Sequence, residues 1–145
     1  MIDYLRLDKQ LCFPLYVASK EVIKKYRPYL DKLNLTYTQY IVMMALWQED
    51  KQSVKQLGDK LFLDSGTLTP LLKALESKGY INRYINEDDE RVLIVELTKK
   101  GNNLKEKAKD VPLKVAACLK LNKNDSKDLY ILLYKLLNNL KENND

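Results

Sequence analysis

Two capping boxes divide the middle of the chain into short helices. Thr36 and Ser53 each stand three residues before a glutamine, Gln39 and Gln56 respectively. In a capping box the hydroxyl accepts a hydrogen bond from the third helical residue, whose side chain bonds back to the cap. The sequence therefore predicts one helix from Thr36 through about Trp47 and a second, shorter helix beginning at Ser53. Their inward faces are expected at Ile41, Met44, Ala45 and Trp47, and at Val54, Leu57 and Leu61.

A third helix follows, and its polar face is unusual. Leucines recur at the i, i+3, i+4, i+7 spacing of a helix with one apolar face. Asp64 or Ser65 can cap its start and Gly79 ends it, while Pro70 leaves the exact start open because proline removes a backbone hydrogen bond. Short hydroxyl side chains fill its first two turns, where an ordinary solvated helix carries long charged residues. The leucines are Leu68, Leu71, Leu72 and Leu75.

Two apolar runs after this helix predict a β-hairpin. Residues 81–85 and 91–97 are expected as strands, with residues 86–90 as the polar turn between them. Two short helices, a hydroxyl-rich helix and a hairpin follow the order of a winged helix-turn-helix. In that fold the third helix enters the major groove of DNA and the hairpin, or wing, lies beside it. The sequence therefore predicts a mainly α fold with a small β-hairpin wing.

The first helix carries the cysteine with the most interesting position. Apolar residues at helical spacing from Leu11 to Tyr26 predict this helix, and Pro14 places its start close to Cys12 because proline is tolerated in the first turn. The helix dipole there favours a negatively charged thiolate, which could attack a peroxide and become a sulfenic acid. The alternative is a small buried hydrophobe, as most free cysteines are. Residues 24–29 are expected to lead into a turn around Asn34.

The C-terminal third is predicted to be helical. Thr98 is expected to cap a long helix from Lys99 to about Leu121, with a kink at Pro112, and a last helix should start at Asp125 or Ser126. The last helix carries a stripe of leucines, and the simplest interpretation is that they pack into the core. The alternative is that they form a homodimer interface with the first helix, since a symmetric operator requires a dimer. The stripe comprises Leu129, Leu132, Leu133, Leu136, Leu137 and Leu140.

The composition argues against several classes of active site. The chain has 145 residues, 46% of them hydrophobic, which suits one domain with a real core, and its net charge of +5 is compatible with nucleic acid. It has no histidine, which removes Ser-His-Asp and Cys-His catalysis and most zinc sites, and its four glycines form no phosphate-binding loop. We therefore expect neither a metal nor a cofactor, and we do not expect an enzyme.

The same survey sets the expected compartment. The N-terminus carries Asp3, Arg6 and Asp8 and lacks the apolar core of a signal peptide, and no apolar run approaches the ~20 residues that span a membrane. We expect a cytoplasmic protein without a membrane partner. In a reducing compartment a structural disulfide between Cys12 and Cys118 is the less favoured interpretation.

Five segments, spread over nearly the whole chain, carry a family resemblance: residues 7–13, 26–28, 35–40, 62–73 and 88–91. Taken together they resemble the multiple antibiotic resistance regulator (MarR) family, and within it the organic hydroperoxide-sensing repressors. Oxidant-responsive global and virulence regulators of the same branch share these motifs. Two departures stand out: Thr38 replaces a usual proline, which the capping box makes benign, and Pro14 replaces a usual aliphatic residue beside the cysteine.

The resemblance implies roles for the cysteines and three tyrosines. Cys12 would be the peroxide sensor, and Tyr26 and Tyr37 would hydrogen-bond its sulfur from the partner subunit, with Tyr16 as a third pocket member. The alternative is that these tyrosines are core or interface aromatics. Cys118 resembles a second, resolving cysteine from the partner subunit; otherwise it is a buried core residue, and a low-molecular-weight thiol completes the oxidation of Cys12.

For DNA, the hydroxyl-rich helix and the wing supply the expected contacts. Ser65, Thr67, Thr69 and Lys73 would meet bases and phosphates. The resemblance implies that Arg91 enters the minor groove, where narrow A·T tracts attract a guanidinium, and that Asp89 orients it through a salt bridge. Arg83 is expected to occupy a solvated strand position.

The resulting hypothesis is a homodimeric repressor on a palindromic operator, which releases DNA when an organic hydroperoxide oxidises Cys12. Residues 35–98 would form the DNA-binding lobe of a single domain, 1–145, and residues 1–34 and 99–145 its dimerisation helices. The alternatives are a repressor or global regulator gated by a phenolic or lipophilic anion or by general oxidants, a thiol peroxidase using Cys12 and Cys118, and an architectural DNA binder.

Overall fold

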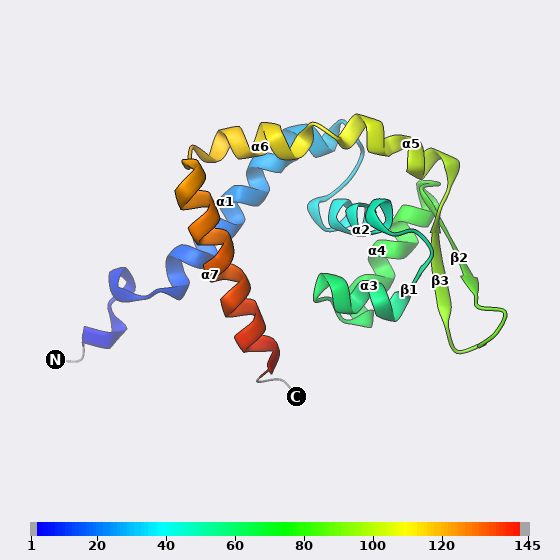
Figure 1. Ribbon diagram of the computed structural model, residues 1–145, viewed down its shortest axis with the longest axis horizontal. Helices are drawn as coiled ribbons and strands as arrows, with labels where there is room; N and C mark the ends of the chain where they lie inside the picture. Colours follow the sequence, from blue (N-terminus) through cyan, green and yellow to red (C-terminus); the bar gives the residue numbers. More distant parts are fainter. Residues whose placement is uncertain (1–2, 143–145) are drawn as a thin grey trace. The chain divides into compact units, whose positions relative to one another are not determined.

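The computed structural model describes residues 3–142, which form helices and one small sheet (Figure 1). The chain divides into two compact units, one up to Val111 and one from Pro112. The first unit contains the 3₁₀ turns η1 (Asp3–Leu5) and η2 (Leu7–Lys9), then α1 (Cys12–Asp31), α2 (Tyr37–Gln48), β1 (Gln52–Ser53), α3 (Val54–Leu61), α4 (Ser65–Ser77), β2 (Ile81–Ile85), β3 (Leu93–Leu97) and α5 (Lys99–Ala108). The helices α6 (Val111–Leu119) and α7 (Lys123–Glu142) follow.

Helix α1 starts at Cys12, as predicted, but it ends later than its sequence suggests. It continues through Pro28 to Asp31 instead of ending in the segment that contains this proline. Leu30, Leu33 and Leu35 are all buried at the corner between α1 and α2, so their packing outweighs the backbone bond that Pro28 removes. The predicted turn is confirmed at Asn34, whose φ of 55° is left-handed.

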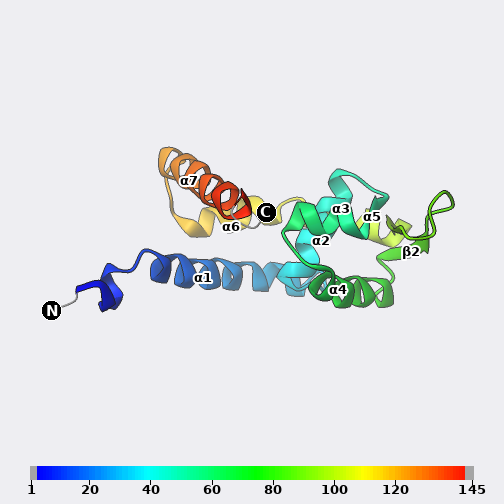
Figure 2. The ribbon, with the colours of Figure 1, turned by 90° about the horizontal axis from the view of Figure 1, so that it is seen from below.

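The predicted helix caps are confirmed by their hydrogen bonds. The Gln39 backbone N–H donates to Thr36 Oγ1 at 3.3 Å, and Gln39 Oε1 accepts from the Thr36 N–H at 3.1 Å. The same reciprocal pair joins Ser53 and Gln56 at 3.0 and 2.9 Å. Of the two candidates for the third cap, Asp64 is the one used. These caps fix the starts of α2, α3 and α4, which form the helix-turn-helix (Figure 2).

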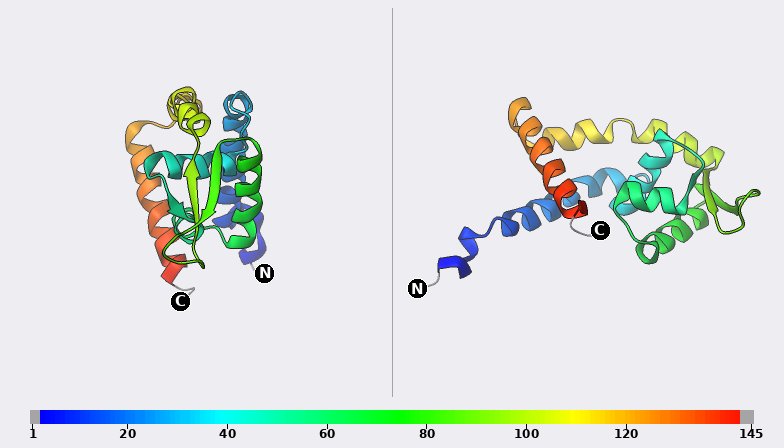
Figure 3. Two further views of the ribbon diagram at one scale, coloured as in Figure 1. Left: turned by 90° about the vertical axis from the view of Figure 1, so that its right-hand side faces the viewer. Right: turned by 60° about the horizontal axis from the view of Figure 1, so that its bottom comes forward.

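The wing is part of a three-stranded antiparallel sheet in the order β1-β3-β2 (Figure 3). The predicted hairpin is confirmed, with Ile81 paired to Leu97 and Ile85 to Leu93. The short strand β1 was not expected. The returning strand begins at Leu93 rather than at Arg91, because Arg91 belongs to a hydrogen-bonded turn.

The core of the first unit lies between the helix-turn-helix and the sheet. One expectation about it is wrong: Met44 is 43% exposed, whereas Val42 and Met43 are fully buried. Trp47 is half-buried, and its indole N–H donates to the Gly101 carbonyl at 3.0 Å, which ties α2 to α5. The fully buried side chains of this unit include Leu30, Met43, Leu46, Leu57, Leu68, Leu72, Leu75, Ile81 and Val95.

The long helix expected after Thr98 is two helices. Thr98 does cap α5, accepting from the Gly101 N–H at 3.0 Å, but the chain breaks at residues 109–110 rather than kinking. Pro112 then lies in the first turn of α6, where its missing N–H leaves no helical bond unmade. The last helix starts before the predicted Asp125 or Ser126, since Asn122 Oδ1 accepts from the Asp125 N–H at 2.8 Å.

The leucine stripe of α7 is not part of the core of the single chain. Leu129, Leu132, Leu136 and Leu140 are 38–61% exposed, and Leu133 and Leu137 are half-buried. Within residues 3–142, no helix combines the length and the apolar character that crossing a bilayer requires.

Candidate nucleic-acid interface and redox site

Helix α4 presents a small-residue face to solvent. Its buried leucines, Leu68, Leu72 and Leu75, hold one side against the lobe. Among the predicted DNA contacts, Ser65, Thr67 and Lys73 are exposed, and Thr69 is half-buried at the edge of the exposed face. Gly66 and Pro70 are also exposed. The sequence therefore places its hydroxyls on the accessible part of this helix.

An anionic cap fixes the first turn of α4. Asp64 Oδ1 accepts the Thr67 backbone N–H at 2.7 Å. Hydrogen bonds from the Thr67 backbone and side chain hold the pKa of Asp64 below its usual range. A carboxylate at a helix N-terminus is also stabilised by the helix dipole. The start of α4 is thus rigid and charged at neutral pH.

The wing arginine is exposed and held by its neighbour. Arg91 Nε lies 3.0 Å from Asp89 Oδ1, and the Arg91 side chain is 90% exposed. Asp89 also accepts the Arg91 backbone N–H at 3.0 Å. The Arg91 guanidinium holds the pKa of Asp89 below its usual range. The expected salt bridge is therefore present, and it leaves the guanidinium accessible to solvent.

Arg83 does not occupy the solvated position that the sequence suggested. Its side chain is 19% exposed, and Nη2 lies 3.1 Å from Glu76 Oε1. The Arg83 backbone N–H also donates to Glu76 Oε2 at 3.2 Å. Because Glu76 lies in α4 and Arg83 in β2, this pair fastens the wing to the helix beside it. The expectation failed because a strand pattern does not reveal a partner on another element.

A cleft of about 340 Å³ separates α4 from the wing. Thr69 contributes from α4 and Arg91 from the wing, so two of the predicted DNA contacts share one cleft. Lys55, exposed at the start of α3, lines the same cleft. Lys55 was not among the predicted DNA contacts, although its position two residues after the Ser53 cap could have indicated an exposed cation. The cleft is lined by Ser53, Val54, Lys55, Thr69, Leu72, Arg83, Arg91, Val92 and Leu93.

Cys12 is the first residue of α1, and it is exposed. Leu11 occupies the cap position and makes no side-chain cap hydrogen bond. The partial positive charge of the first backbone N–H groups is therefore not offset by a side-chain acceptor at this position. The buried-hydrophobe interpretation of Cys12 does not hold for the single chain.

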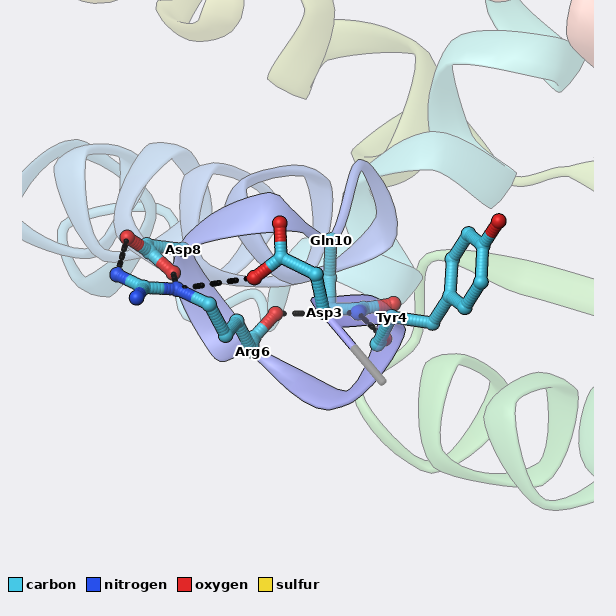
Figure 4. A network of polar contacts seen from close by, with 5 residues as sticks. All are labelled: Asp3, Tyr4, Arg6, Asp8 and Gln10. Carbon is cyan, nitrogen blue, oxygen red and sulfur yellow. Dashed lines mark hydrogen bonds and ion pairs between the residues drawn. The ribbon is translucent and has the colours of Figure 1, made fainter. Parts of the chain in front are cut away.

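A polar network occupies the segment before Cys12 (Figure 4). Arg6 Nη2 lies 2.7 Å from Asp8 Oδ2, and Arg6 Nε lies 3.7 Å from Asp3 Oδ1. The Gln10 side-chain amide donates to the backbone carbonyls of Tyr4 and Arg6. The Arg6 guanidinium holds the pKa of Asp8 below its usual range. These bonds give the exposed segment a defined fold up to the cysteine.

Two of the predicted pocket tyrosines lie together at the other end of α1. The Tyr26 and Tyr37 ring centroids are 5.0 Å apart, and Tyr40 joins them at 5.8 Å from Tyr26. Burial raises the pKa of Tyr37, and burial together with Tyr37 raises that of Tyr26. Burial, with both neighbours adding to it, raises the pKa of Tyr40 to about 12. All three are therefore neutral O–H groups at physiological pH.

This tyrosine cluster is far from the sulfur of its own chain. At a rise of 1.5 Å per residue, Cys12 and Tyr26 are about 21 Å apart along α1. Tyr16 lies one turn after Cys12 and is 59% exposed, with Lys20 Nζ 4.8 Å from its ring centroid. Thus the fold places Tyr16 near Cys12 and brings Tyr26 and Tyr37 together, but it does not bring the two groups into contact within α1.

Cys118 lies in α6 and is exposed, with its Sγ–H donating to the Lys114 carbonyl 3.3 Å away. The alternative interpretation of Cys118 as a buried core residue therefore does not hold for the single chain. Within residues 3–142 no group of three His, Cys, Asp or Glu side chains is arranged to hold a metal ion.

Comparison with known proteins gives consistent matches. Residues 24–108 match the family model described as Transcriptional regulator SarA/Rot. Over 142 residues the chain is 46% identical to the organic hydroperoxide resistance transcriptional regulator of Bacillus subtilis (strain 168), covering 98% of this chain and 97% of that protein. It is 48% identical over 132 residues to the regulator SarZ of Staphylococcus saprophyticus, covering 91% and 90%.

Solved structures of AbfR from Staphylococcus epidermidis are also similar. Reduced AbfR bound to DNA matches with a TM-score of 0.83 and 33% identity, covering 99% of each chain. Disulfide-formed AbfR matches with a TM-score of 0.63 and 34% identity, covering 96% of this chain and 92% of that one.

These matches confirm the resemblance and the winged-helix fold expected from the sequence. The family model and both named relatives are transcriptional regulators, which also confirms that the chain is not an enzyme. The chain therefore belongs to the MarR/SarA family of winged-helix, DNA-binding transcriptional regulators.

Proposed function

We propose that the protein is a homodimeric repressor that releases a palindromic operator when an organic peroxide oxidises Cys12. The observation that carries the proposal is the position of this cysteine: it is exposed, at the first residue of α1, with no side-chain cap. Similarity to the Bacillus subtilis organic hydroperoxide resistance regulator supports the choice of oxidant.

The oxidation step needs only the thiolate and the peroxide. The Cys12 thiolate attacks the terminal oxygen of the hydroperoxide, so an S–O bond forms and the O–O bond breaks. The sulfur loses two electrons and becomes a sulfenic acid, while the alkoxide takes a proton and leaves as an alcohol. The step requires Cys12 as the thiolate, because the thiolate and not the thiol is the nucleophile.

A second copy of the chain supplies the rest of the pocket in this proposal. Tyr26 is about 21 Å along α1 from the Cys12 of the same chain, and the Tyr37 ring lies against it, so both are proposed to donate to the sulfur of a partner. Their raised pKa values keep both phenols protonated as donors. The exposed α7 leucine stripe offers an apolar surface for that partner.

The sulfenic acid then has two possible outcomes. The Cys118 thiolate of the partner subunit can attack the sulfenic sulfur, forming an S–S bond and expelling hydroxide, which leaves as water. A low-molecular-weight thiol can do the same chemistry in its place. Because Cys118 is exposed in α6, it is accessible for the first route, and the existence of a disulfide form of AbfR supports it. Either product would move the two α4 helices out of register with the operator.

On DNA, the exposed face of α4 enters the major groove, where Ser65, Thr67, Thr69 and Lys73 make the contacts. Arg91, oriented by Asp89, enters the minor groove, and Lys55 contacts the phosphate backbone from the shared cleft. The DNA complex of AbfR supports this use of the fold.

The test is a gel shift on a palindromic duplex from the region upstream of the gene, with and without cumene hydroperoxide. Wild type should bind and then be released, whereas Cys12→Ser should bind and stay bound. Intact mass distinguishes the routes: a dimer-sized, reductant-sensitive species indicates a Cys12–Cys118 bridge, and a monomer carrying added oxygen or a small thiol indicates the one-cysteine route. A normal response in Cys12→Ser would contradict the proposal.

A ligand-gated repressor is the second candidate, favoured by one cleft. This cleft, of about 300 Å³ between α1 and α2, is lined by the charged Arg27 and Asp31, by the apolar Ile23, Leu30 and Leu35, and by Thr36, Tyr37 and Thr38. A cation beside apolar walls suits a phenolic or lipophilic anion. This function predicts release of DNA by such an anion in the Cys12→Ser variant, with no change in thiol mass.

A further inference from the structure

The first two turns of α4 carry little side chain on the face opposite the buried leucines. Helical periodicity places Gly66 and Pro70 directly opposite the buried leucines, with Thr67 and Thr69 to either side. Both Gly66 and Pro70 are exposed. DNA brought against these two turns therefore meets backbone at the centre and hydroxyls at the flanks, and Lys73 follows on the same face.

The fold of the chain gives no reason for a glycine at position 66. Among residues 3–142, a Cβ added to Gly66 would have only Asp64 Oδ1 within 4 Å, at an ordinary 3.4 Å. By contrast, a Cβ on Gly58 or Gly101 would meet backbone atoms at 2.8 and 2.0 Å. Since glycine within a helix is destabilising relative to alanine, a requirement from outside the chain best accounts for Gly66.

Pro70 leaves the carbonyl of this same residue without its normal partner. In an α-helix the Gly66 carbonyl would accept from the N–H of residue 70, but proline has none. The proline ring also crowds the carbonyl four residues earlier and pushes it outward. Gly66 and Pro70, both costly in a helix, thus leave one backbone acceptor of α4 without its α-helical hydrogen bond.

We infer that the Gly66 carbonyl reads the operator directly, by accepting a hydrogen bond from the exocyclic amino group of an adenine or cytosine in the major groove. Those amino groups are the donors that the major groove presents. Gly66 lacks a side chain because the backbone must approach the base edge, and Pro70 keeps the acceptor free. The inference rests on the proposed placement of α4 in the major groove.

The experiment uses fluorescence anisotropy of the full chain on the operator, together with thermal unfolding. Gly66→Ala and Pro70→Ala should each raise Tm by a few degrees because both improve the helix. Each should nevertheless weaken operator binding about tenfold, the scale of one lost contact of about 1.4 kcal/mol. Asn102→Ala, at an exposed position of α5, is the matched control: a helix-favouring change that should leave DNA affinity unaltered.

Operators with single base analogues locate the contact. Purine in place of adenine, or 2-pyrimidinone in place of cytosine, deletes only the amino group. At one position in each half-site this deletion should weaken wild type about tenfold and have little further effect on Pro70→Ala, since the partner is already lost.

Two results would overturn the inference. If Gly66→Ala and Pro70→Ala bind as tightly as wild type, no backbone contact is made. If the losses from Pro70→Ala and from the analogues add at every position, the amino group has another partner. A wild-type chain that does not bind the operator at all would instead refute the proposed placement of α4, and this inference with it.

Discussion

Arg83 Nη2 and Glu76 Oε1 lie 3.1 Å apart and join the wing to the end of α4. The two elements proposed to contact different grooves of DNA are therefore held at a fixed separation by an ion pair, which the Arg83 backbone N–H reinforces. The pair matters for DNA binding because α4 and the wing can reach their two grooves together only while their separation is kept.

Breaking this pair should reduce DNA affinity more than stability. Arg83→Gln is expected to bind the operator about tenfold more weakly, equivalent to about 1.4 kcal/mol, because the wing is no longer fixed to α4. Tm should fall by only a few degrees, since the pair is partly exposed. Lys109→Gln removes an exposed pair with Glu106 and is the control, which should bind normally. Equal affinity of Arg83→Gln and wild type would show that the wing position does not matter.

The same pair has an acid dependence. Arg83 holds the pKa of Glu76 below its usual range, so the folded state favours the ionised carboxylate. The contribution of the Glu76–Arg83 pair to stability should be complete above the ordinary glutamate pKa and should be lost as the pH falls through the lowered pKa of Glu76. Glu76→Gln should therefore flatten the loss of Tm on acidification below about pH 4.5. Thermal unfolding between pH 3 and 7 measures this, and an unchanged acid profile would contradict it.

Arg91 should contribute to affinity chiefly through its charge. Arg91→Ala is expected to weaken operator binding by about tenfold. It should also reduce the slope of log affinity against log salt concentration by about one, because one fewer counterion is released. Asp89→Asn keeps an oxygen for the Arg91 backbone N–H and keeps the guanidinium, so its effect should be smaller. Anisotropy titrations over a range of salt concentrations measure both quantities; an unchanged salt slope in Arg91→Ala would rule out the contact.

Ionisation of the Tyr40 phenol should destabilise the fold at high pH. Tyr40 is 2% exposed and its pKa is raised to about 12, so the folded state favours the protonated phenol. The contribution of Tyr40 to the free energy of unfolding should be complete below about pH 10 and should decline as the pH rises toward 12. Tyr40→Phe should lose less over this window, by on the order of 2 kcal/mol at its upper end. Denaturation curves from pH 9 to 12 provide the test, with the exposed Tyr4→Phe expected to behave as wild type.

Gly101 should not tolerate any side chain. A Cβ there would lie 2.0 Å from the Tyr80 carbonyl oxygen, which is backbone and cannot move aside. Gly101→Ala should therefore cost about 3 kcal/mol or more, or prevent folding. The neighbouring Asn102→Ala should stay within about 0.5 kcal/mol of wild type. Circular dichroism melts distinguish the two, and a normal melt for Gly101→Ala would show that α5 can shift away from β2.

Leu132 tests the proposed homodimer. It is 61% exposed in the single chain, so a charge there should not harm the core but should disrupt an apolar interface. Leu132→Asp should shift the mass measured by light scattering toward the monomer of 17.0 kDa. Asn138→Asp, on the opposite side of α7, should leave the dimer intact. A dimer that persists in Leu132→Asp would place the interface elsewhere.

Features set by a few consecutive residues could be predicted from the sequence. Thr36, Ser53 and Thr98 cap helices as expected because a cap needs only its own next turn. The hairpin could be located because its strands and turn are adjacent in the chain. The resemblance to the family implied the roles proposed for the pocket tyrosines and for Arg91, which no local pattern supplies.

Features that depend on distant partners could not be predicted. Glu76 and Arg83 pair across two elements, and β1 exists only because Gln52 pairs with Val95. The continuation of α1 past Pro28 depends on buried leucines that propensity does not count. The separation of Cys12 from Tyr26 is different again: it follows from simple helix geometry once the helix is known to run unbroken between them.

That separation has a genetic consequence. If each redox pocket takes its sulfur from one chain and its phenol from the other, a Cys12→Ser allele and a Tyr26→Phe allele damage different halves of the same pocket. A mixed dimer of the two products would carry both defects in one pocket and none in the other. Two alleles that each fail alone should then restore a peroxide response when expressed together, by intragenic complementation.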